Sequence, residues 1–226
     1  MTYTQSMVIE LVTPIFKDGN LDEPNNYRGI CISSVLLKIV CSLLQNGIQE
    51  HCNKFNLINE NQIGFKGNHR TADHLLTLKA IVKKYVIIEK KKLFACFVDF
   101  KKAFDSIWHE GLFHKVINYG ITNNILNLIK DIYKKTKCSV KVDNYTTDIF
   151  EFTKGVRQGC PLSPILFNVY INDIFEIVNN DNETDIFLEE GKKINALMYA
   201  DDVILLSDTK EGLQRQIDKL SQYCDN

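Results

Sequence analysis

Two short apolar segments near the C-terminal end of the sequence are separated by only two residues, and both of those are aspartates. The flanking segments are 196–200 and 203–206, and the separating residues are Asp201 and Asp202. Apolar segments of four or five residues with a two-residue break are typical of a β-hairpin. The two carboxylates are therefore predicted to lie at the tip of a hairpin.

A pair of aspartates is an unusual choice for such a turn. A two-residue turn favours Asn-Gly or Asp-Gly, and adjacent like charges repel each other. A bound cation would offset this repulsion, and carboxylate oxygens suit Mg²⁺, which also takes ligands from substrate phosphates. A merely solvated turn is the alternative interpretation.

A third aspartate follows another predicted strand. Residues 93–98 form a six-residue apolar run, which predicts a strand buried on both faces and ending at Asp99. Residues 101–120 then predict one helix or a pair of short helices, stopping at Gly120. With the hairpin tip, Asp99 would complete a three-acid site for two metal ions and in-line phosphoryl transfer. On its own, Asp99 also fits an ordinary helix cap.

A glycine-rich and proline-rich loop lies between these acids in the sequence. Residues 155–164 read GVRQGCPLSP, and Ser163 and Pro164 are predicted as the N-cap and first residue of the helix that follows. The loop carries Arg157 and Gln158 between two glycines, a pattern that lets side chains approach phosphates and a base closely. By itself this pattern is a weak signal.

Three earlier segments are predicted from apolar spacing and turn residues. Residues 13–30 are typical of hairpins or loops. Residues 33–51 predict a helix capped by Ser33 or Ser34. Residues 71–88 predict a second helix, ended by the lysine run 90–92. The faces expected to be buried are Val35, Leu36, Ile39, Val40, Leu43 and Leu44 in the first helix, and Leu75, Leu78, Ile81, Val82 and Tyr85 in the second.

The net charge of −1 hides an uneven distribution. Residues 79–141 carry 14 Lys and Arg against 5 Asp and Glu, whereas residues 142–226 carry 7 against 16. One part of the chain is therefore suited to a polyanion and another to cations, although each cluster also fits a solvated helix face.

Composition narrows the class of protein. With 226 residues, 45% hydrophobic and 24% charged, the chain is expected to form one large domain or a core with an added lobe. The longest apolar run is far too short to cross a membrane. The N-terminus has no secretion signal, and seven scattered cysteines without a CxxC pair are typical of reduced thiols in an intracellular protein.

Several blocks of the sequence occur in the order known from one family. The blocks VTPIFKDGN…PNNYRGI and NENQIGFKGNHRTADHLLTLKAI are similar to its fingers segments. The blocks FVDFKKAFDSIWHEGL, GVRQGCPLSPILFNVYINDI and YADDVILLS are similar to its polymerase motifs A, B and C. In this combination the chain resembles the reverse transcriptases of non-LTR (LINE-type) retrotransposons over essentially its whole length.

The resemblance implies an α+β, right-hand polymerase fold with fingers and an antiparallel palm sheet. Residues 1–92 would be mainly fingers, and residues 93–226 mainly palm with part of the fingers interleaved. The implied activity is that of an RNA-directed DNA polymerase core, which takes an RNA template, a DNA primer and dNTPs. The thumb, endonuclease and zinc-binding domains of the family are not expected, so the chain is interpreted as a fragment of a retrotransposon polyprotein. A nuclear location is expected at the integration step.

The resemblance also assigns roles to single residues. Two Mg²⁺ ions, with Mn²⁺ as a substitute, would be held by the acidic cluster and one backbone carbonyl. Phe104 would be the steric gate against ribose, and Gln158 would lie against the incoming nucleotide. The metal-binding set is Asp99, Phe100, Asp201 and Asp202; the other nucleotide-binding residues are Arg157, Arg28 and Lys38; and the nucleic-acid-binding residues are Gly159 and Tyr199.

Alternatives stay open at this point. Phe104 fits plain core packing, and Arg28 fits a surface ion pair. Gly67 to Arg70 departs from the family's usual Gly-Arg-Ser run, so the template contact of that loop is not implied. A catalytically incompetent nucleic-acid-binding remnant and a two-metal nuclease remain as other function classes. The nuclease is less favoured because none of the histidines adjoins Asp99, Asp201 or Asp202 in the sequence. The sequence does not indicate an oligomeric state.

Overall fold

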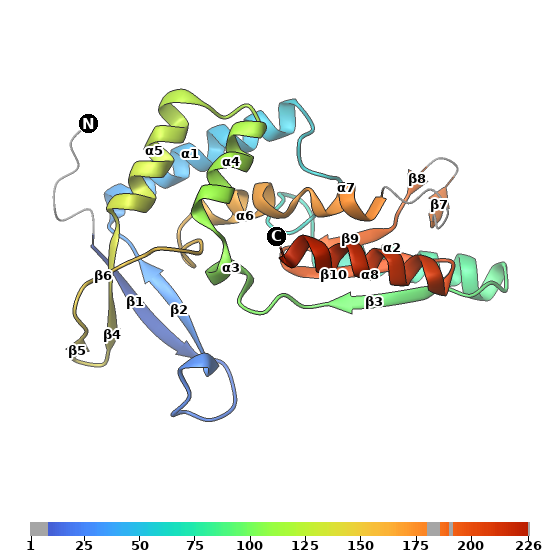
Figure 1. Ribbon diagram of the computed structural model, residues 1–226, viewed down its shortest axis with the longest axis horizontal. Helices are drawn as coiled ribbons and strands as arrows, with labels where there is room; N and C mark the ends of the chain where they lie inside the picture. The colour runs from blue at the N-terminus through green and yellow to red at the C-terminus, as the bar shows by residue number, and fades with distance from the viewer. Residues whose placement is uncertain (1–8, 180–185, 190–191, 226) are drawn as a thin grey trace. The chain divides into compact units, whose positions relative to one another are not determined.

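The structure is a computed structural model, and it describes residues 9–179, 186–189 and 192–225 (Figure 1). The chain divides into two compact units, each built from two chain segments. Unit 1 contains the chain up to Leu57 and Lys102–Tyr170, and unit 2 contains Ile58–Lys101 and the chain from Ile171 onward. Residues 58–92 thus lie in the same unit as the acid-bearing strands, and the expected division into fingers and palm stays a prediction.

Unit 1 contains a mixed five-stranded sheet with the order β2-β1-β4-β5, in which β6 also pairs with β4. Strands β1 and β2 are antiparallel and enclose a loop with a short 3₁₀ turn, as the turn-rich 13–30 segment predicted. Strand β1 runs parallel to β4. The bounds are β1 Ile9–Phe16, β2 Tyr27–Ile32, β4 Lys137–Val142, β5 Tyr145–Thr146, β6 Phe150–Glu151 and the 3₁₀ turn Pro24–Asn26.

The helices of unit 1 follow the predicted segments closely. The expected pair of short helices after Asp99 is present as α3 and α4. Ser34 caps α1, because its side-chain oxygen accepts a hydrogen bond from the backbone nitrogen of Leu37 (3.3 Å). Helix α6 begins at Ser163, one residue earlier than predicted, and runs to the first residue of unit 2. The bounds are α1 Val35–Lys54, α3 Ala103–Ser106, α4 His109–Asn118, α5 Asn123–Lys135 and α6 Ser163–Ile171.

The buried face of α1 is not the one predicted. The side chains that it buries are Leu37, Cys41, Ile48 and Cys52. Val35 and Leu43, which were expected in the core, are 73% and 68% exposed. Both sets recur at intervals of three or four residues, so periodicity predicts the helix but does not choose between its two stripes. The tertiary contacts of unit 1 choose the stripe with the cysteines.

Unit 2 contains an antiparallel three-stranded sheet with the order β3-β10-β9 and a two-stranded sheet of β7 and β8. The second predicted helix is present as α2, which continues as a π-helical segment, η3. The bounds are α2 Thr71–Val82, η3 Lys83–Ile88, β3 Phe94–Val98, α7 Ile174–Asn179, β7 Phe187–Glu189, β8 Lys192–Lys193, β9 Ala196–Tyr199, β10 Asp202–Ser207 and α8 Lys210–Asp225.

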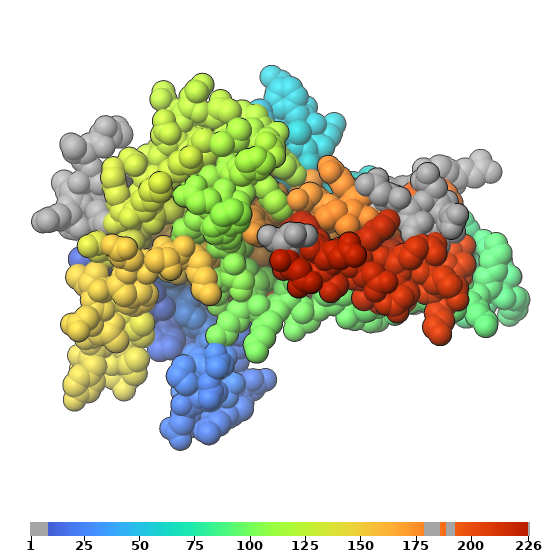
Figure 2. Space-filling model, in the orientation of Figure 1, coloured from blue at the N-terminus to red at the C-terminus, as the bar shows by residue number. Residues whose placement is uncertain are grey.

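Helices cover the central strand of this sheet. Helix α2 packs against β9, and α8, drawn in red at the surface in Figure 2, packs against β10 and β3. One core cluster joins Ile81 and Tyr85 to Leu197 and Leu206. Strand β3 lies at the edge and leaves Phe97 72% exposed, so the prediction that this strand is buried on both faces is wrong. Among the described residues no helix has the length and apolar character needed to span a membrane.

Candidate active site

The turn between β9 and β10 carries the acidic pair. Tyr199 pairs with Asp202, so the two turn residues are Ala200 and Asp201, and Asp202 is the first residue of β10. The predicted hairpin is therefore present, but its turn is displaced by one residue toward the N-terminus. Ala200 has a φ of 56°, which lies in the left-handed region that a β-carbon disfavours.

Asp99 lies beside this turn because of strand register. Val98 is paired with Val203, so Asp99 follows β3 at the position facing Asp202. The pKa of Asp202 is raised, first by desolvation and then by the negative charges of Asp201 and Asp99. Asp99 is about a hundred positions from Asp201 and Asp202 in the sequence, yet the three carboxylates are electrostatic neighbours in unit 2.

The donor chemistry of these acids fits a divalent cation. Carboxylate oxygens are preferred ligands of Mg²⁺ and Mn²⁺, and a cation would relieve the repulsion that adds to desolvation in raising the Asp202 pKa. Asp99 and Asp202 are exposed and Asp201 is half-buried, so solvent and ions can reach them. However, no three acidic, histidine or cysteine side chains in the described ranges form a ready-made metal cluster. The three-acid site for two metal ions therefore stays a prediction.

A cavity of about 280 Å³ opens beside two of the acids. Its lining includes Asp99, Asp202, Tyr199 and His74, together with apolar side chains of α2 and of the sheet. The sequence argument that no histidine accompanies the acids thus holds along the chain but not in space.

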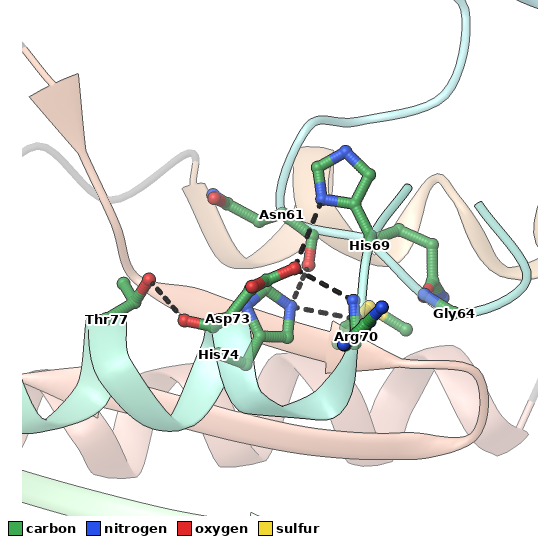
Figure 3. Close-up of polar contacts among 9 residues, drawn as sticks. Asn61, Gly64, His69, Arg70, Asp73, His74 and Thr77 are labelled. Atoms are coloured by element: carbon green, nitrogen blue, oxygen red, sulfur yellow. Dashed lines mark hydrogen bonds and ion pairs between the residues drawn. The ribbon is translucent and has the colours of Figure 1, made fainter. Parts of the chain in front are cut away.

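The side chain of His74 bonds to two separate backbone segments. Its Nε2 lies 2.9 Å from the carbonyl oxygen of Asn61 and 3.0 Å from that of Met198, as Figure 3 shows for the residues it labels. Because both partners are acceptors, Nε2 must carry the hydrogen. Burial lowers the pKa of His74, which favours the neutral ring. Helix α2, which contains His74, begins three residues earlier, at Thr71. At this end of the helix Asp73 accepts a hydrogen bond from the backbone nitrogen of Arg70 (2.8 Å).

The segment around Asn61 was missed as part of the site. It runs beside β9, where Gln62 forms a parallel bridge with Met198. Gln62 is completely buried and bonds to the backbone of Ala200 in the acid turn. The block containing Gln62 was recognised in the sequence as a fingers segment, but nothing in its pattern pointed to the acids.

Arg157 is in the interior of unit 1. It is 1% exposed, and its Nη1 donates to Glu10 (2.8 Å) and to the hydroxyl of Thr136 (3.0 Å). Its guanidinium lies 4.8 Å from the centre of the Tyr133 ring, a cation–π contact. These partners are those of a structural ion pair, so we assign Arg157 to packing and not to nucleotide contact.

Its neighbour Gln158 is only partly buried and has different contacts. The side-chain nitrogen of Gln158 donates a hydrogen bond to Asp105 (3.2 Å). The backbone carbonyl of Gln158 accepts one from the backbone nitrogen of Cys31 (2.7 Å). Gly159 has a φ of 101°, and a β-carbon there would lie 2.8 Å from the carbonyl oxygen of Cys31. Gly159 is therefore required by the close approach of the loop to β2, whatever else it contacts.

Phe104 is stacked on Phe167, with ring centres 4.4 Å apart and planes inclined by 6°. The ring is partly exposed, so core packing and a gating role are both compatible with its position. Among the other predicted site residues, Arg28 is exposed on β2 and Lys38 is half-buried on α1. Phe100 and Tyr199, in unit 2, are half-buried.

A family model described as "Reverse transcriptase (RNA-dependent DNA polymerase)" matches residues 15–226, nearly the whole sequence. The chain belongs to the reverse transcriptase family. The resemblance to the non-LTR retrotransposon enzymes is also confirmed by its curated relatives.

One relative is the "Retrovirus-related Pol polyprotein from type-1 retrotransposable element R2" of Nasonia vitripennis, which is 31% identical over 90% of this chain and 19% of its own length. The "RNA-directed DNA polymerase from mobile element jockey" of Drosophila melanogaster is 26% identical over 89% of this chain and 22% of its own. The chain thus spans about a fifth of these relatives.

Solved structures of telomerase share the fold. The apo telomerase of Candida tropicalis, truncated from its C-terminal domain, superimposes with a TM-score of 0.67 at 17% identity, covering 97% of this chain and 47% of that one. The α+β polymerase fold of fingers and palm predicted from the sequence is therefore confirmed.

Proposed function

We propose that this reverse transcriptase domain catalyses RNA-directed DNA synthesis, transferring a nucleotide from a dNTP to a primer 3′-OH. The observation that carries the proposal is the juxtaposition of Asp99 and Asp202 at the ends of paired strands, with Asp201 in the adjoining turn. The pKa of Asp202 is raised by desolvation and, in second place, by the negative charges of Asp201 and Asp99 at the same place. Charge of this kind at an accessible strand end is suited to binding cations.

In this mechanism Asp99, Asp201 and Asp202 would hold two Mg²⁺ ions, with the carbonyl of Phe100 as a further ligand. Such ions activate the attacking oxygen and stabilise the leaving oxygen in phosphoryl transfer. The chain's own residues would supply binding and orientation: the register of β3, β10 and β9 places the three acids at the same end of the sheet. An RNA template, a DNA primer and dNTPs are the partners that we propose on the basis of family membership.

The assay is primer extension on poly(rA)/oligo(dT) with Mg²⁺ or Mn²⁺. We expect Asp99→Asn and Asp201→Asn to abolish extension. Asp208→Asn is the matched control because Asp208 follows the opposite end of β10, and it should retain activity. Equal extension by the wild type and Asp201→Asn would contradict the proposal. Template binding without any extension by the wild type would favour a non-catalytic nucleic-acid-binding domain.

We further propose that Phe104 selects deoxyribose by blocking the ribose 2′-OH. Its stacking on Phe167 would hold the ring in one orientation, and it follows Asp99 by five positions. Phe104→Val should raise the ratio of ribonucleotide to deoxyribonucleotide incorporation. Phe113→Val, a change of the same size in the core of unit 1, should lower stability without changing that ratio. An unchanged ratio in Phe104→Val would identify Phe104 as packing alone.

A further inference from the structure

The turn that carries Asp201 contains a residue in an unfavourable conformation. Ala200 has a positive φ of 56°, and it is buried at 6% exposure. Positive φ in two-residue hairpin turns is ordinarily supplied by glycine, asparagine or aspartate, because a β-carbon is crowded there. Since the sequence places an alanine at this point, contacts from elsewhere in the fold must help to hold it.

One side chain bonds to both backbone polar groups of Ala200. The Oε1 of Gln62 accepts a hydrogen bond from the Ala200 nitrogen (3.0 Å), and its Nε2 donates to the Ala200 carbonyl oxygen (3.1 Å). The same Oε1 accepts from the nitrogen of Gly64 (2.9 Å). Gln62 is completely buried, so these bonds do not compete with solvent. The neutral amide of Gln62 supplies both the acceptor and the donor that these backbone groups require.

The segment that carries Gln62 is itself fixed to β9. The Met198 nitrogen donates to the Asn61 carbonyl (2.9 Å), and the Ile63 nitrogen donates to the Met198 carbonyl (3.1 Å). The segment also approaches the turn too closely for any side chain at Gly64, where a β-carbon would lie 2.1 Å from the Ala200 nitrogen. His74, on α2, bonds to the carbonyls of Asn61 and Met198; Figure 3 labels His74 and Asn61.

We propose that Gln62 is a positioning residue for the acidic turn: it holds Ala200 at positive φ and thereby fixes the direction of the Asp201 and Asp202 carboxylates. The inference rests on the proposed function, since it assigns Gln62 to the metal-binding acids. An uncharged side chain suits this position because a cationic side chain would pair with the carboxylates and compete with the metal. Gln62 touches neither substrate nor metal in this role.

The test compares two buried glutamines on the same sheet in the full 226-residue chain. Gln216 is also completely buried, and its Nε2 donates to the carbonyl of Leu206 (3.1 Å), near the end of β10 opposite the acids. Gln62→Met and Gln216→Met each replace a buried amide with an apolar side chain of similar length, but the first removes three hydrogen bonds and the second removes one. Gln62→Met should lower the midpoint of urea unfolding, and Gln216→Met should lower it less. Only Gln62→Met should change the acid site.

Direct binding of Mn²⁺, followed by electron paramagnetic resonance, is the readout that does not depend on activity. We expect Gln62→Met to raise the Mn²⁺ dissociation constant about tenfold and Gln216→Met to change it less than twofold. In primer extension, Gln62→Met should raise the Mg²⁺ concentration for half-maximal rate. Gln62→Asn, which keeps an amide but is one methylene short, should weaken Mn²⁺ binding as well, and it serves if the methionine variant does not fold.

A second change tests the backbone mechanism. Glycine tolerates positive φ without a brace, so Ala200→Gly should restore part of the Mn²⁺ affinity in the Gln62→Met background. Equal Mn²⁺ affinity in the folded Gln62 and Gln216 variants would overturn the inference while leaving the proposed function intact. If Asp201→Asn binds Mn²⁺ as tightly as the wild type does, the proposed function fails, and the role of Gln62 fails with it.

Discussion

Two loops of this protein carry predicted site residues, and they are held in chemically opposite ways. In unit 2, the acid turn is held by neutral groups, the amide of Gln62 and the ring of His74, which bond to backbone atoms. In unit 1, the loop 155–160 contains Arg157, whose charge is buried against Glu10.

The difference follows from what each loop presents. Under the proposed function, a metal would have to reach the carboxylates of the acid turn, and a fixed positive charge beside the turn would neutralise them. In the unit 1 loop the charge points inward and is compensated by Glu10, while Gln158 next to it is partly exposed. A buried ion pair is tolerated only when both partners are present. The two loops should therefore respond very differently to substitution.

The largest effect is expected from removing the charge partner in unit 1. Glu10→Gln should lower the free energy of unfolding by roughly 3–5 kcal/mol, because it leaves the Arg157 guanidinium buried without compensation. The double variant Glu10→Met with Arg157→Met should recover most of this loss. Urea denaturation measures both. A loss below about 1 kcal/mol for Glu10→Gln would show that solvent reaches Arg157 and that the comparison between the loops is wrong.

The corresponding change in unit 2 should be smaller and steric in origin. Gly64→Ala should cost about 1–3 kcal/mol, the usual penalty of overpacking, because its β-carbon would collide with the Ala200 backbone. Gly67→Ala is the matched control, since a β-carbon there meets nothing within 4 Å. Thermal unfolding of the two variants provides the measurement, and equal stability would mean that the segment does not approach the turn so closely.

A pH effect is expected in unit 1 from His109. Its Nε2 lies 2.7 Å from the carbonyl oxygen of Gly155, and burial lowers its pKa from 6.5. The unfolded chain therefore binds the proton more readily, and stability falls as the pH drops through about 6.5 toward the lower folded pKa. The loss should stay below about 1.4 kcal/mol per pH unit, because a single titrating group exchanges at most one proton.

His109→Gln should weaken this pH dependence. The control is His114→Gln on the exposed side of the same helix, which should leave the dependence as in the wild type. Urea midpoints at pH 7.5 and pH 5 distinguish the two. Identical slopes for the wild type and His109→Gln would exclude this histidine as the source.

The smallest effect on stability is expected at Gln158. Gln158→Leu removes one hydrogen bond to the exposed Asp105, so the free energy of unfolding should change by less than about 0.5 kcal/mol. In primer extension, the same variant should raise the KM for dNTP if the side chain lies against the nucleotide. A stability loss as large as that of Glu10→Gln would show that Gln158 and Arg157 are not divided between surface and core as described.

Local patterns accounted for most of the elements. The apolar runs predicted β3, β9 and β10, the serine before α1 predicted its cap, and the turn-rich 13–30 segment predicted the hairpin of β1 and β2. Such features depend on neighbours in the sequence, so they can be recognised without the fold. The pair of adjacent aspartates was recognisable for the same reason, because its repulsion is a local property.

Other features depended on contacts between distant segments. The stripe of α1 that is buried, the pairing that brings Asp99 opposite Asp202, and the inward direction of Arg157 are decided by what packs against them. Arg157 and Gln158 are adjacent in the sequence and both have long polar side chains, yet Arg157 is in the core and Gln158 is partly exposed.

The sequence by itself determined that this chain is a reverse transcriptase domain with an acidic hairpin. Only the tertiary structure decided how that hairpin is held. Gln62 and Ala200 are 138 positions apart, and no periodicity or motif links them. Their contact exists because the segment that carries Gln62 pairs with the free edge of β9. This pairing is made by backbone hydrogen bonds, which any sequence can form, so the sequence does not reveal it.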